Sequence, residues 1–295
     1  MRRLFQIGLL GLLTCHLSGC KPPTGPKITI GSKFFTEQVL LAELLAQHIE
    51  ARTGIHVERK TNLGGTLLVH QAILAGALDL YVEYTGTALT AVLHESPGSE
   101  DSAAIYRRVK QLYGQRFHLT VTEPLGFENT FAMVVRHDDA QRFHLKNVSD
   151  VTPIASKWRV GVGYEFLERP DGFPGLAKTY NLHFARPPTV LDLGLLYRAL
   201  VSRQVDMVAG NSTDGAIEAL DLVPLTDDHR YFPPYDAVPI IREDTLARLP
   251  ALRRALAELD GKISSADMRH LNSEVDVDQR DPATVVRVFR ESRGL

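Results

Sequence analysis

The chain has 295 residues, of which 44% are hydrophobic and 23% are charged. That composition supports a core of one or two domains and excludes a disordered polar chain. Lys and Arg number 33 against 35 Asp and Glu, a formal net charge of -2, so no basic field is available to hold nucleic acid.

The first 20 residues have the pattern of a secretory signal. Two arginines precede the apolar stretch from Leu4 to Leu13, which is too short to cross a bilayer as a stable helix. The run that ends it, Leu17-Ser18-Gly19-Cys20, resembles a bacterial lipobox, in which the cysteine is lipidated and becomes the first mature residue. We therefore expect residues 1–20 to be a lipoprotein signal peptide and Cys20 to anchor the protein outside the cytoplasm, in the periplasm or at the cell surface. The alternative is an ordinary apolar segment that contains a cysteine.

Residues 21–26 are expected to be a short linker that prolines stiffen. The only other cysteine, Cys15, lies in the segment that would be removed. If Cys20 carries lipid, no disulfide can form, and stability must come from packing.

From Lys27 the pattern alternates between strand and helix. The expected elements are a strand at 28–30, a helix at 37–53, a strand at 57–60, a helix at 67–75 and a strand at 78–82. A polar turn is expected at 83–87. This series predicts a mostly parallel sheet with helices on both faces.

The same pattern returns later, with strands expected at 159–162 and 205–209, a helix at 193–201 and a polar turn at 210–215. Ligands of open α/β sheets bind beyond the carboxyl ends of the strands, where such turns lie. The two turns, at 83–87 and 210–215, indicate either two lobes that face one cleft or two turns of a single sheet. Further on, residues 246–259 are expected to form a helix.

No enzyme signature is present in the sequence. None of the 11 histidines belongs to a His-x-x-x-His pair or a Cys/His cluster, and there is no Walker loop or Gly-x-Ser-x-Gly elbow. Gly161-Val162-Gly163 lacks the third glycine of a dinucleotide fingerprint and is interpreted as a tight turn. We expect no enzymatic activity, no metal and no cofactor.

Six blocks, in order, resemble those of the substrate-binding proteins of glycine betaine/choline (osmoprotectant) ABC importers. They are residues 31–38, 62–66, 79–87, 168–172, 212–215 and 233–236. The resemblance extends from Lys27 to the C-terminus, and the lipobox agrees with it because many family members are lipoproteins.

The resemblance implies an α/β, two-lobe periplasmic-binding-protein fold (type II-like), each lobe a mixed sheet flanked by helices, with the ligand in the cleft between them. Lobe I would comprise residues 27–128 plus 236–295, and lobe II residues 129–235. Hinge closure around a ligand is a known motion of periplasmic binding proteins. The implied partners are an ABC permease and ATPase, and the protein is expected to be a monomer.

A quaternary ammonium group has no N–H to donate, so recognition depends on aromatic faces around the charge. Carried over from the family, the cage positions fall on Tyr84, Phe131, Asn211 and Tyr235. Asn211 is the main departure, because the family more often has tyrosine there. Asn129 occupies a nearby position where some relatives carry an acidic residue. Phe131 stands in place of a tyrosine, so the ring is kept and a hydroxyl is lost. The changes at Asn211 and Phe131 weigh against simple glycine betaine and leave a larger or more polar betaine, choline or carnitine more open.

The family's carboxylate-binding arginine aligns with Arg169, whose guanidinium can make two parallel hydrogen bonds. Lys33 and Thr87 align with supporting positions in the first lobe. Taken singly, each of these residues has a structural alternative: the aromatic residues can be core, Arg169 can pair with Glu168 or Asp171, and Lys33 can be solvated. Trp158 is expected to pack inside lobe II. Glu37 and Gln38 are expected to cap a helix with Ser32 or Thr36.

The function expected from the resemblance is that of an extracytoplasmic binding lipoprotein for a quaternary-ammonium solute. Two alternatives remain: a binding protein for another small zwitterion or amine, and a ligand-sensing module for a membrane receptor.

Overall fold

The structure is a computed structural model that describes residues 25–98 and 100–295. The signal peptide, the predicted lipidation site at Cys20 and most of the linker lie outside the described residues. Within the described part, no helix has both the length and the apolar character needed to cross a membrane.

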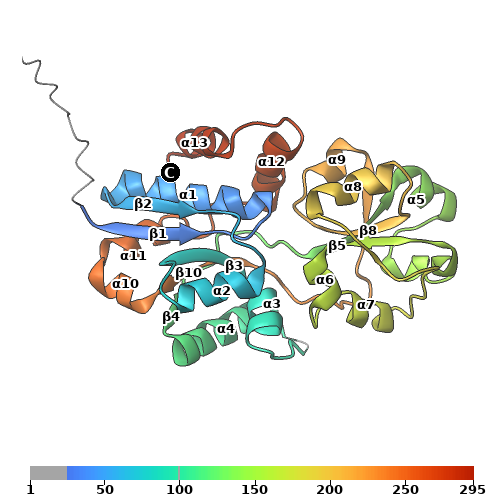
Figure 1. Ribbon diagram of the computed structural model, residues 1–295, viewed down its shortest axis with the longest axis horizontal. Helices are drawn as coiled ribbons and strands as arrows, with labels where there is room; N and C mark the ends of the chain where they lie inside the picture. The colour runs from blue at the N-terminus through green and yellow to red at the C-terminus, as the bar shows by residue number, and fades with distance from the viewer. Residues whose placement is uncertain (1–24, 99) are drawn as a thin grey trace, which may run out of the picture.

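Two five-stranded sheets form the cores of two lobes that lie beside each other (Figure 1). The sheet of lobe I has the order β2-β1-β3-β10-β4, where β1 is Lys27–Gly31, β2 is His56–Lys60, β3 is Leu80–Tyr84, β4 is Leu119–Val121 and β10 is Ala237–Arg242. The strands β1, β2 and β3 are parallel, whereas β10 runs antiparallel to both β3 and β4. The sheet is therefore mixed, as expected.

The sheet of lobe II repeats this plan with the order β7-β6-β8-β5-β9. Its strands are β5 (Phe131–Arg136), β6 (Val160–Val162), β7 (Thr189–Val190), β8 (Met207–Asn211) and β9 (Leu222–Leu225). Again three strands are parallel, and β5 is antiparallel to β8 and β9. In each sheet the antiparallel strand, β10 or β5, is the first strand after the chain crosses from the other lobe.

Helices cover both sheets. In lobe I they are α1 (Thr36–Thr53), α2 (Thr66–Leu74), α3 (Thr85–Thr87), α4 (Ser102–Phe117), α10 (Glu243–Arg248), α11 (Ala251–Ala257), α12 (Ser265–Asp276) and α13 (Pro282–Arg293), with a π-helical turn at Ala88–Val92. In lobe II they are α5 (His137–Phe143), α6 (Tyr164–Glu168), α7 (Phe173–Thr179), α8 (Leu193–Val201) and α9 (Ala216–Ala219), with 3-10 turns at Val148–Val151 and Ala155–Lys157. Each sheet has an apolar cluster on either face, so each lobe has its own core.

The chain crosses between the lobes twice, and the two crossings pair with each other. Glu128 and Asp236 form an antiparallel bridge, and the backbone N–H of Asn129 donates to the carbonyl of Tyr235 at 3.1 Å. The connection between the lobes is thus a short two-stranded ribbon. Such a ribbon is a suitable hinge, because few backbone torsions need to change for the lobes to move.

The C-terminal helices return to lobe I, where α12 and α13 pack on α1. Figure 1 shows α12 at the edge of lobe I that faces α8 and α9 of lobe II. The small helix α9 contacts α12 directly, so the C-terminal part of the chain forms part of the contact between the lobes.

The expected strands and helices are present with small shifts of their ends, and two local predictions were wrong. Residues 83–87 do not form a polar turn, because Glu83 and Tyr84 continue β3 and Thr85 begins α3. The helix expected at 246–259 is interrupted at Leu249 and Pro250, since proline removes a backbone donor and disfavours a helical conformation for the residue before it. Trp158 packs in the core of lobe II, edge-on to Phe143, as predicted.

Candidate ligand-binding site

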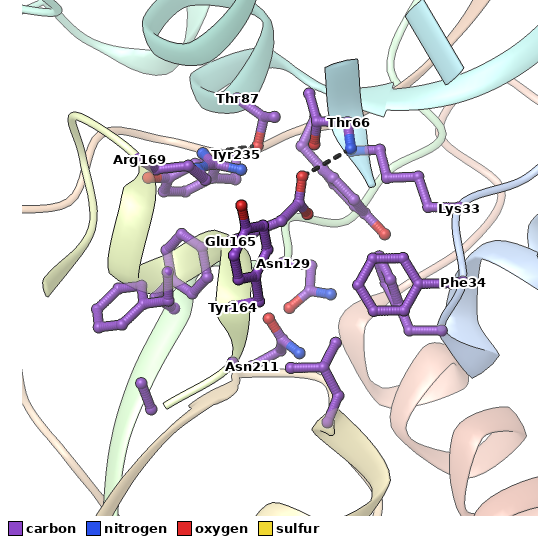
Figure 2. A pocket seen from close by; sticks show the side chains of 17 residues that line it. Lys33, Phe34, Thr66, Thr87, Asn129, Tyr164, Glu165, Arg169, Asn211 and Tyr235 are labelled. Atoms are coloured by element: carbon purple, nitrogen blue, oxygen red, sulfur yellow. Dashed lines mark hydrogen bonds between the residues drawn. The ribbon is translucent and has the colours of Figure 1, made fainter. Parts of the chain in front are cut away.

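A cavity of about 60 Å³ lies between the lobes and is lined by side chains from both (Figure 2). All eight residues that the sequence singled out line it: Lys33, Tyr84, Thr87, Asn129, Phe131, Arg169, Asn211 and Tyr235. The structure therefore brings together positions that are up to about 200 residues apart in the chain. None of the eight lies elsewhere.

Aromatic side chains make up much of the lining: Phe34, Phe35, Tyr84, Phe131, Tyr164, Phe166 and Tyr235. Phe131 is the centre of the group on the lobe II side. Its ring centroid is 5.8 Å from that of Tyr235 in a near-perpendicular arrangement and 4.6 Å from that of Phe166. Burying the phenolic hydroxyls raises the pKa of both Tyr84 and Tyr235 well above its usual value, so these rings stay neutral.

Lys33 is buried, not solvated, and its ammonium group is already paired. Nζ donates to Oε1 of Glu83, which is completely buried in β3, and lies 5.2 Å from the centre of the Tyr84 ring. Burial raises the pKa of Glu83, although the nearby Lys33 charge opposes that shift. Lys33 thus contributes to the cavity as half of an ion pair, which is a more neutral group than the sequence suggested.

Arg169 makes a two-point ion pair with Asp171. Its Nε donates to Oδ1 at 2.8 Å and its Nη2 to Oδ2 at 2.5 Å. Nη2 also donates across the cleft to the hydroxyl of Thr87 at 3.1 Å, a bond visible in Figure 2. Burial works against ionisation of Asp171, but the hydrogen bond and charge of Arg169 outweigh it and lower the pKa of this carboxyl. The alternative pairing of Arg169 with Asp171, noted from the sequence, is therefore real, and it coexists with the position of Arg169 at the cavity wall.

Tyr235 belongs to the same network, because its hydroxyl donates to Oδ2 of Asp171 at 2.5 Å. The carboxylate of Asp171 thus orients both a cavity cation and a cavity ring. A rigid arrangement of this kind lets a site act on a ligand without first reorganising.

Asn211 is held in place by the turn that follows β8. Its backbone N–H donates to Oδ2 of Asp214 at 2.9 Å, and its side-chain amide makes only long contacts of 3.4 Å with the same carboxylate. The hydroxyl of Tyr197 also donates to Asp214, at 2.6 Å. The Asn211 amide is therefore weakly committed to the protein and remains able to bond a ligand.

A second, larger cleft of about 790 Å³ adjoins the cavity. The two spaces share Phe34, Phe35, Leu193 and Asn211 in their linings. The cavity and the cleft therefore meet at these four residues.

Sequence reasoning missed several lining residues. Phe34 and Phe35 lie inside the first family block, and their aromatic character was available as a signal. Tyr164, Glu165 and Phe166 follow β6 at its carboxyl end, directly after the turn at Gly163. The position at the carboxyl end of a parallel strand was the signal that pointed to them.

The predicted role of Glu37 as a helix cap was wrong. The N-cap residue of α1 is Phe35, and no side chain caps this helix. The carboxylate of Glu37 instead turns toward the interior and accepts hydrogen bonds from Tyr84 and Asn129, among others. A buried acceptor of this kind cannot be distinguished from a cap by sequence spacing alone.

Two lobes with matching mixed sheets, joined by a two-stranded connection and enclosing an aromatic cavity, define a solute-binding protein of the periplasmic type. The particular family follows from comparison with known proteins: residues 26–292 match the substrate-binding domain of the ABC-type glycine betaine transport system, and the chain belongs to that family. It is a family of transport binding proteins, not of enzymes.

Individual relatives agree with this assignment. The carnitine transport binding protein OpuCC of Listeria monocytogenes (serotype 1/2a, strain 10403S) is 36% identical over 297 residues, which cover 99% of this chain and 96% of that protein. The ergothioneine transport permease/ergothioneine binding protein EgtU of Helicobacter pylori (strain G27) is 33% identical over 269 residues, 91% of this chain and 48% of that protein. A crystal structure of a glycine betaine/carnitine/choline ABC transporter protein is 32% identical, covers 90% of this chain and 98% of its own, and has a TM-score of 0.76.

Proposed function

We propose that this protein captures a quaternary-ammonium compatible solute, such as glycine betaine, carnitine, choline or a related betaine, and delivers it to the permease of an ABC importer. The observation that carries the proposal is that aromatic rings and a guanidinium group line one cavity. Cζ of Arg169 is 5.1 Å from the centre of the Phe131 ring, so both kinds of group are within the length of one small zwitterion.

The two ends of a betaine suit these two kinds of group. Desolvated aromatic faces attract a diffuse positive charge by roughly 0.5 to 2 kcal/mol per contact, so several rings are needed for useful affinity. At the other end, Nε and Nη2 of Arg169 are used by Asp171 and Thr87, while Nη1 makes no hydrogen bond with the described residues. Nη1 is the donor that we assign to the ligand carboxylate, with Thr87 and Lys33 beside it.

The test is calorimetric titration of the full chain with glycine betaine, carnitine and choline, and with dimethylglycine as a matched control. Dimethylglycine has one methyl group fewer and is a tertiary amine with an N–H in its zwitterionic form. A site built from aromatic faces should bind glycine betaine at least tenfold more tightly than dimethylglycine. Equal affinities, or no binding of any quaternary amine, would contradict the proposal.

Within this class, a narrower candidate is a larger betaine with another polar group, bound in preference to glycine betaine. Asn211 favours it, because its amide is only weakly bonded within the protein and the adjoining cleft opens beside it. Two relatives of this chain are named as binding proteins for carnitine and for ergothioneine, and both compounds are ligands of that kind. Ergothioneine is therefore added to the same set of titrations, and tighter binding of carnitine or ergothioneine than of glycine betaine would select this candidate.

We further propose that the hinge lies at residues 128–129 and 235–236, and that Cys20 is lipidated and holds the protein at the outer side of a membrane. The family supports a permease and an ATPase as partners. A ligand-sensing role without a permease is the alternative, and a transport assay in cells that lack this protein separates the two.

A further inference from the structure

Glu37 lies outside the lining of the small cavity, yet it touches both lobes. It stands in the first turn of α1 and is 3% exposed. Each of its two carboxylate oxygens accepts two hydrogen bonds, and all four donors are uncharged side chains. The donors are Tyr84 and Asn129 to Oε1, at 2.5 and 2.8 Å, and Thr213 and Asn272 to Oε2, at 2.5 and 3.0 Å.

The two oxygens face different parts of the molecule. The donors to Oε1 line the ligand cavity: Tyr84 lies at the end of β3, and Asn129 lies in the hinge. One donor to Oε2, Asn272, is on α12 of lobe I, whereas the other, Thr213, follows β8 in lobe II. One carboxylate therefore joins the cavity wall to a contact between the lobes.

The contact around Thr213 is close and buried. The Thr213 side chain is completely buried, and its backbone carbonyl also accepts from Nδ2 of Asn272 at 2.9 Å. Two residues further on, a Cβ on Gly215 would lie 2.6 Å from backbone atoms of Ser273. The turn after β8 thus meets α12 with no space for a side chain at this point.

Opening of the cleft has to break this contact. Thr213 moves with lobe II, while Glu37 and Asn272 move with lobe I, so the bonds from Thr213 to Glu37 and from Asn272 to Thr213 exist only when the lobes are together. The bonds from Tyr84 and Asn129 to Glu37 stay within lobe I and the hinge. A buried carboxylate that loses a donor must find water or another partner, which makes the open form less favourable for Glu37 than the closed one.

We infer that Glu37 is a positioning residue that couples closure of the lobes to the ligand cavity, with Thr213 as the latch on lobe II. Closure gives Glu37 its full set of donors, and the same carboxylate fixes the Tyr84 hydroxyl and the Asn129 amide at the cavity wall. The latch does not touch the ligand, so it adds the same free energy to the binding of every ligand that closes the cleft. The experiment below has two parts. The ligand-binding measurements rest on the proposed function, whereas the measurements of lobe closure in the ligand-free protein do not.

The experiment compares Thr213→Val, which removes the hydroxyl at nearly constant volume, with Thr213→Ser, which keeps it. The matched control is Thr245→Val, because Thr245 is also buried and donates to a carboxylate, Asp79, but within lobe I alone. Thermal unfolding shows whether the two valine variants remain folded. Interlobe distance is measured by fluorescence energy transfer in the full chain with Cys15 and Cys20 changed to serine, and with labels at exposed Lys178 on α7 and Arg253 on α11.

We expect Thr213→Val to lower the closed fraction of the ligand-free protein, to weaken glycine betaine, carnitine and choline by the same factor of about 3 to 30, and to speed their dissociation accordingly. Thr213→Ser and Thr245→Val should behave like the wild type in closure and affinity. The inference fails if Thr213→Val leaves the interlobe distance unchanged, if the serine variant behaves like the valine variant, or if one ligand alone is weakened. If no quaternary amine binds the wild type, the proposed function fails, and the distances in ligand-free protein still test the latch.

Discussion

Arg169 is the residue on which the proposed carboxylate site depends most. Changing it to alanine should weaken a betaine by roughly 2 to 5 kcal/mol, because the ligand carboxylate would be buried without its main partner. Choline has no carboxylate and should lose much less. Calorimetry with glycine betaine and choline measures both effects.

Arg159→Ala is the matched control for Arg169→Ala. Arg159 also pairs with an aspartate of lobe II at two points, Asp206, but on an exposed surface. Arg159→Ala should leave the affinities for glycine betaine and choline unchanged. Equal losses of affinity for betaine and choline in Arg169→Ala would contradict a carboxylate site at Arg169. They would indicate that the variant acts by disturbing Asp171 and Tyr235.

Asn211 decides between a plain betaine and a larger one. Asn211→Tyr should place a further ring between the cavity and the adjoining cleft and improve binding of glycine betaine by about 0.5 to 2 kcal/mol. A larger betaine that needs the amide, or the space beside it, should bind more weakly to the same variant, because a buried polar group would be left without a partner. Titration of wild type and variant with glycine betaine, carnitine and ergothioneine measures the change. If no affinity moves, Asn211 is not in contact with the ligand.

The turn after β8 carries more of the site than its sequence suggested. As a polar turn with a glycine it was predicted to face a ligand, and Asn211 does line the cavity. Its other members act inside the protein: Thr213 bonds Glu37, Asp214 holds Asn211, and Gly215 packs against α12. The hold of Asp214 on Asn211 is local, whereas the roles of Thr213 and Gly215 depend on α1 and α12, which are far away along the chain and which no local pattern could reveal.

Asp214 makes this turn sensitive to pH. Burial raises the pKa of Asp214 to about 6, with Glu37 adding to the shift, whereas the hydrogen bonds from Tyr197 and Asn211 oppose it. A carboxyl whose pKa is raised on folding stabilises the fold when protonated, and that contribution is lost as pH rises through the folded pKa. Between pH 4 and 7 the wild type should therefore lose stability relative to Asp214→Asn, by roughly 1 to 3 kcal/mol.

Chemical denaturation of both proteins at pH 4, 5, 6 and 7 measures the difference. Asp150→Asn is a suitable control, since backbone hydrogen bonds from Asn147 and Lys146 lower the pKa of Asp150. Its contribution to stability is lost only as pH falls below the unfolded pKa, so the difference between wild type and Asp150→Asn should stay nearly constant from pH 5 to 7. A constant difference between wild type and Asp214→Asn across this range would show that Asp214 does not titrate there.

The two-lobe architecture was predictable only in part from periodicity. Alternating strands and helices indicated parallel sheets. The strands β1, β2 and β3 of one sheet and β6, β7 and β8 of the other agree with that prediction. The antiparallel strands β5 and β10 follow the chain crossings, and their direction is a property of the tertiary fold. For these, the resemblance to a family supplied what the local pattern could not. The resemblance also picked out the eight residues that line the cavity. The ion pair of Arg169 with Asp171 was one alternative noted from the sequence, whereas the ion pair of Lys33 with Glu83 emerged only from the packing.

In the proposed topology, the location of the whole protein depends on Cys20. If this cysteine carries the lipid, Cys20→Ala should release the protein from membranes into the soluble extracytoplasmic fraction, because all of the anchoring lipid is attached to that one residue. Several acyl chains on one cysteine bind a membrane firmly, while a single chain binds it only marginally. The fold should not change, since the first strand begins at Lys27, beyond the proline-containing linker.

Cell fractionation measures the release, and ligand titration of the released protein checks that the lobes still close on their ligand. Cys15→Ala is the control, because Cys15 would be removed with the signal and its loss should leave the protein on the membrane. Retention of Cys20→Ala on the membrane would mean that some other part of the chain, or a partner, holds it there.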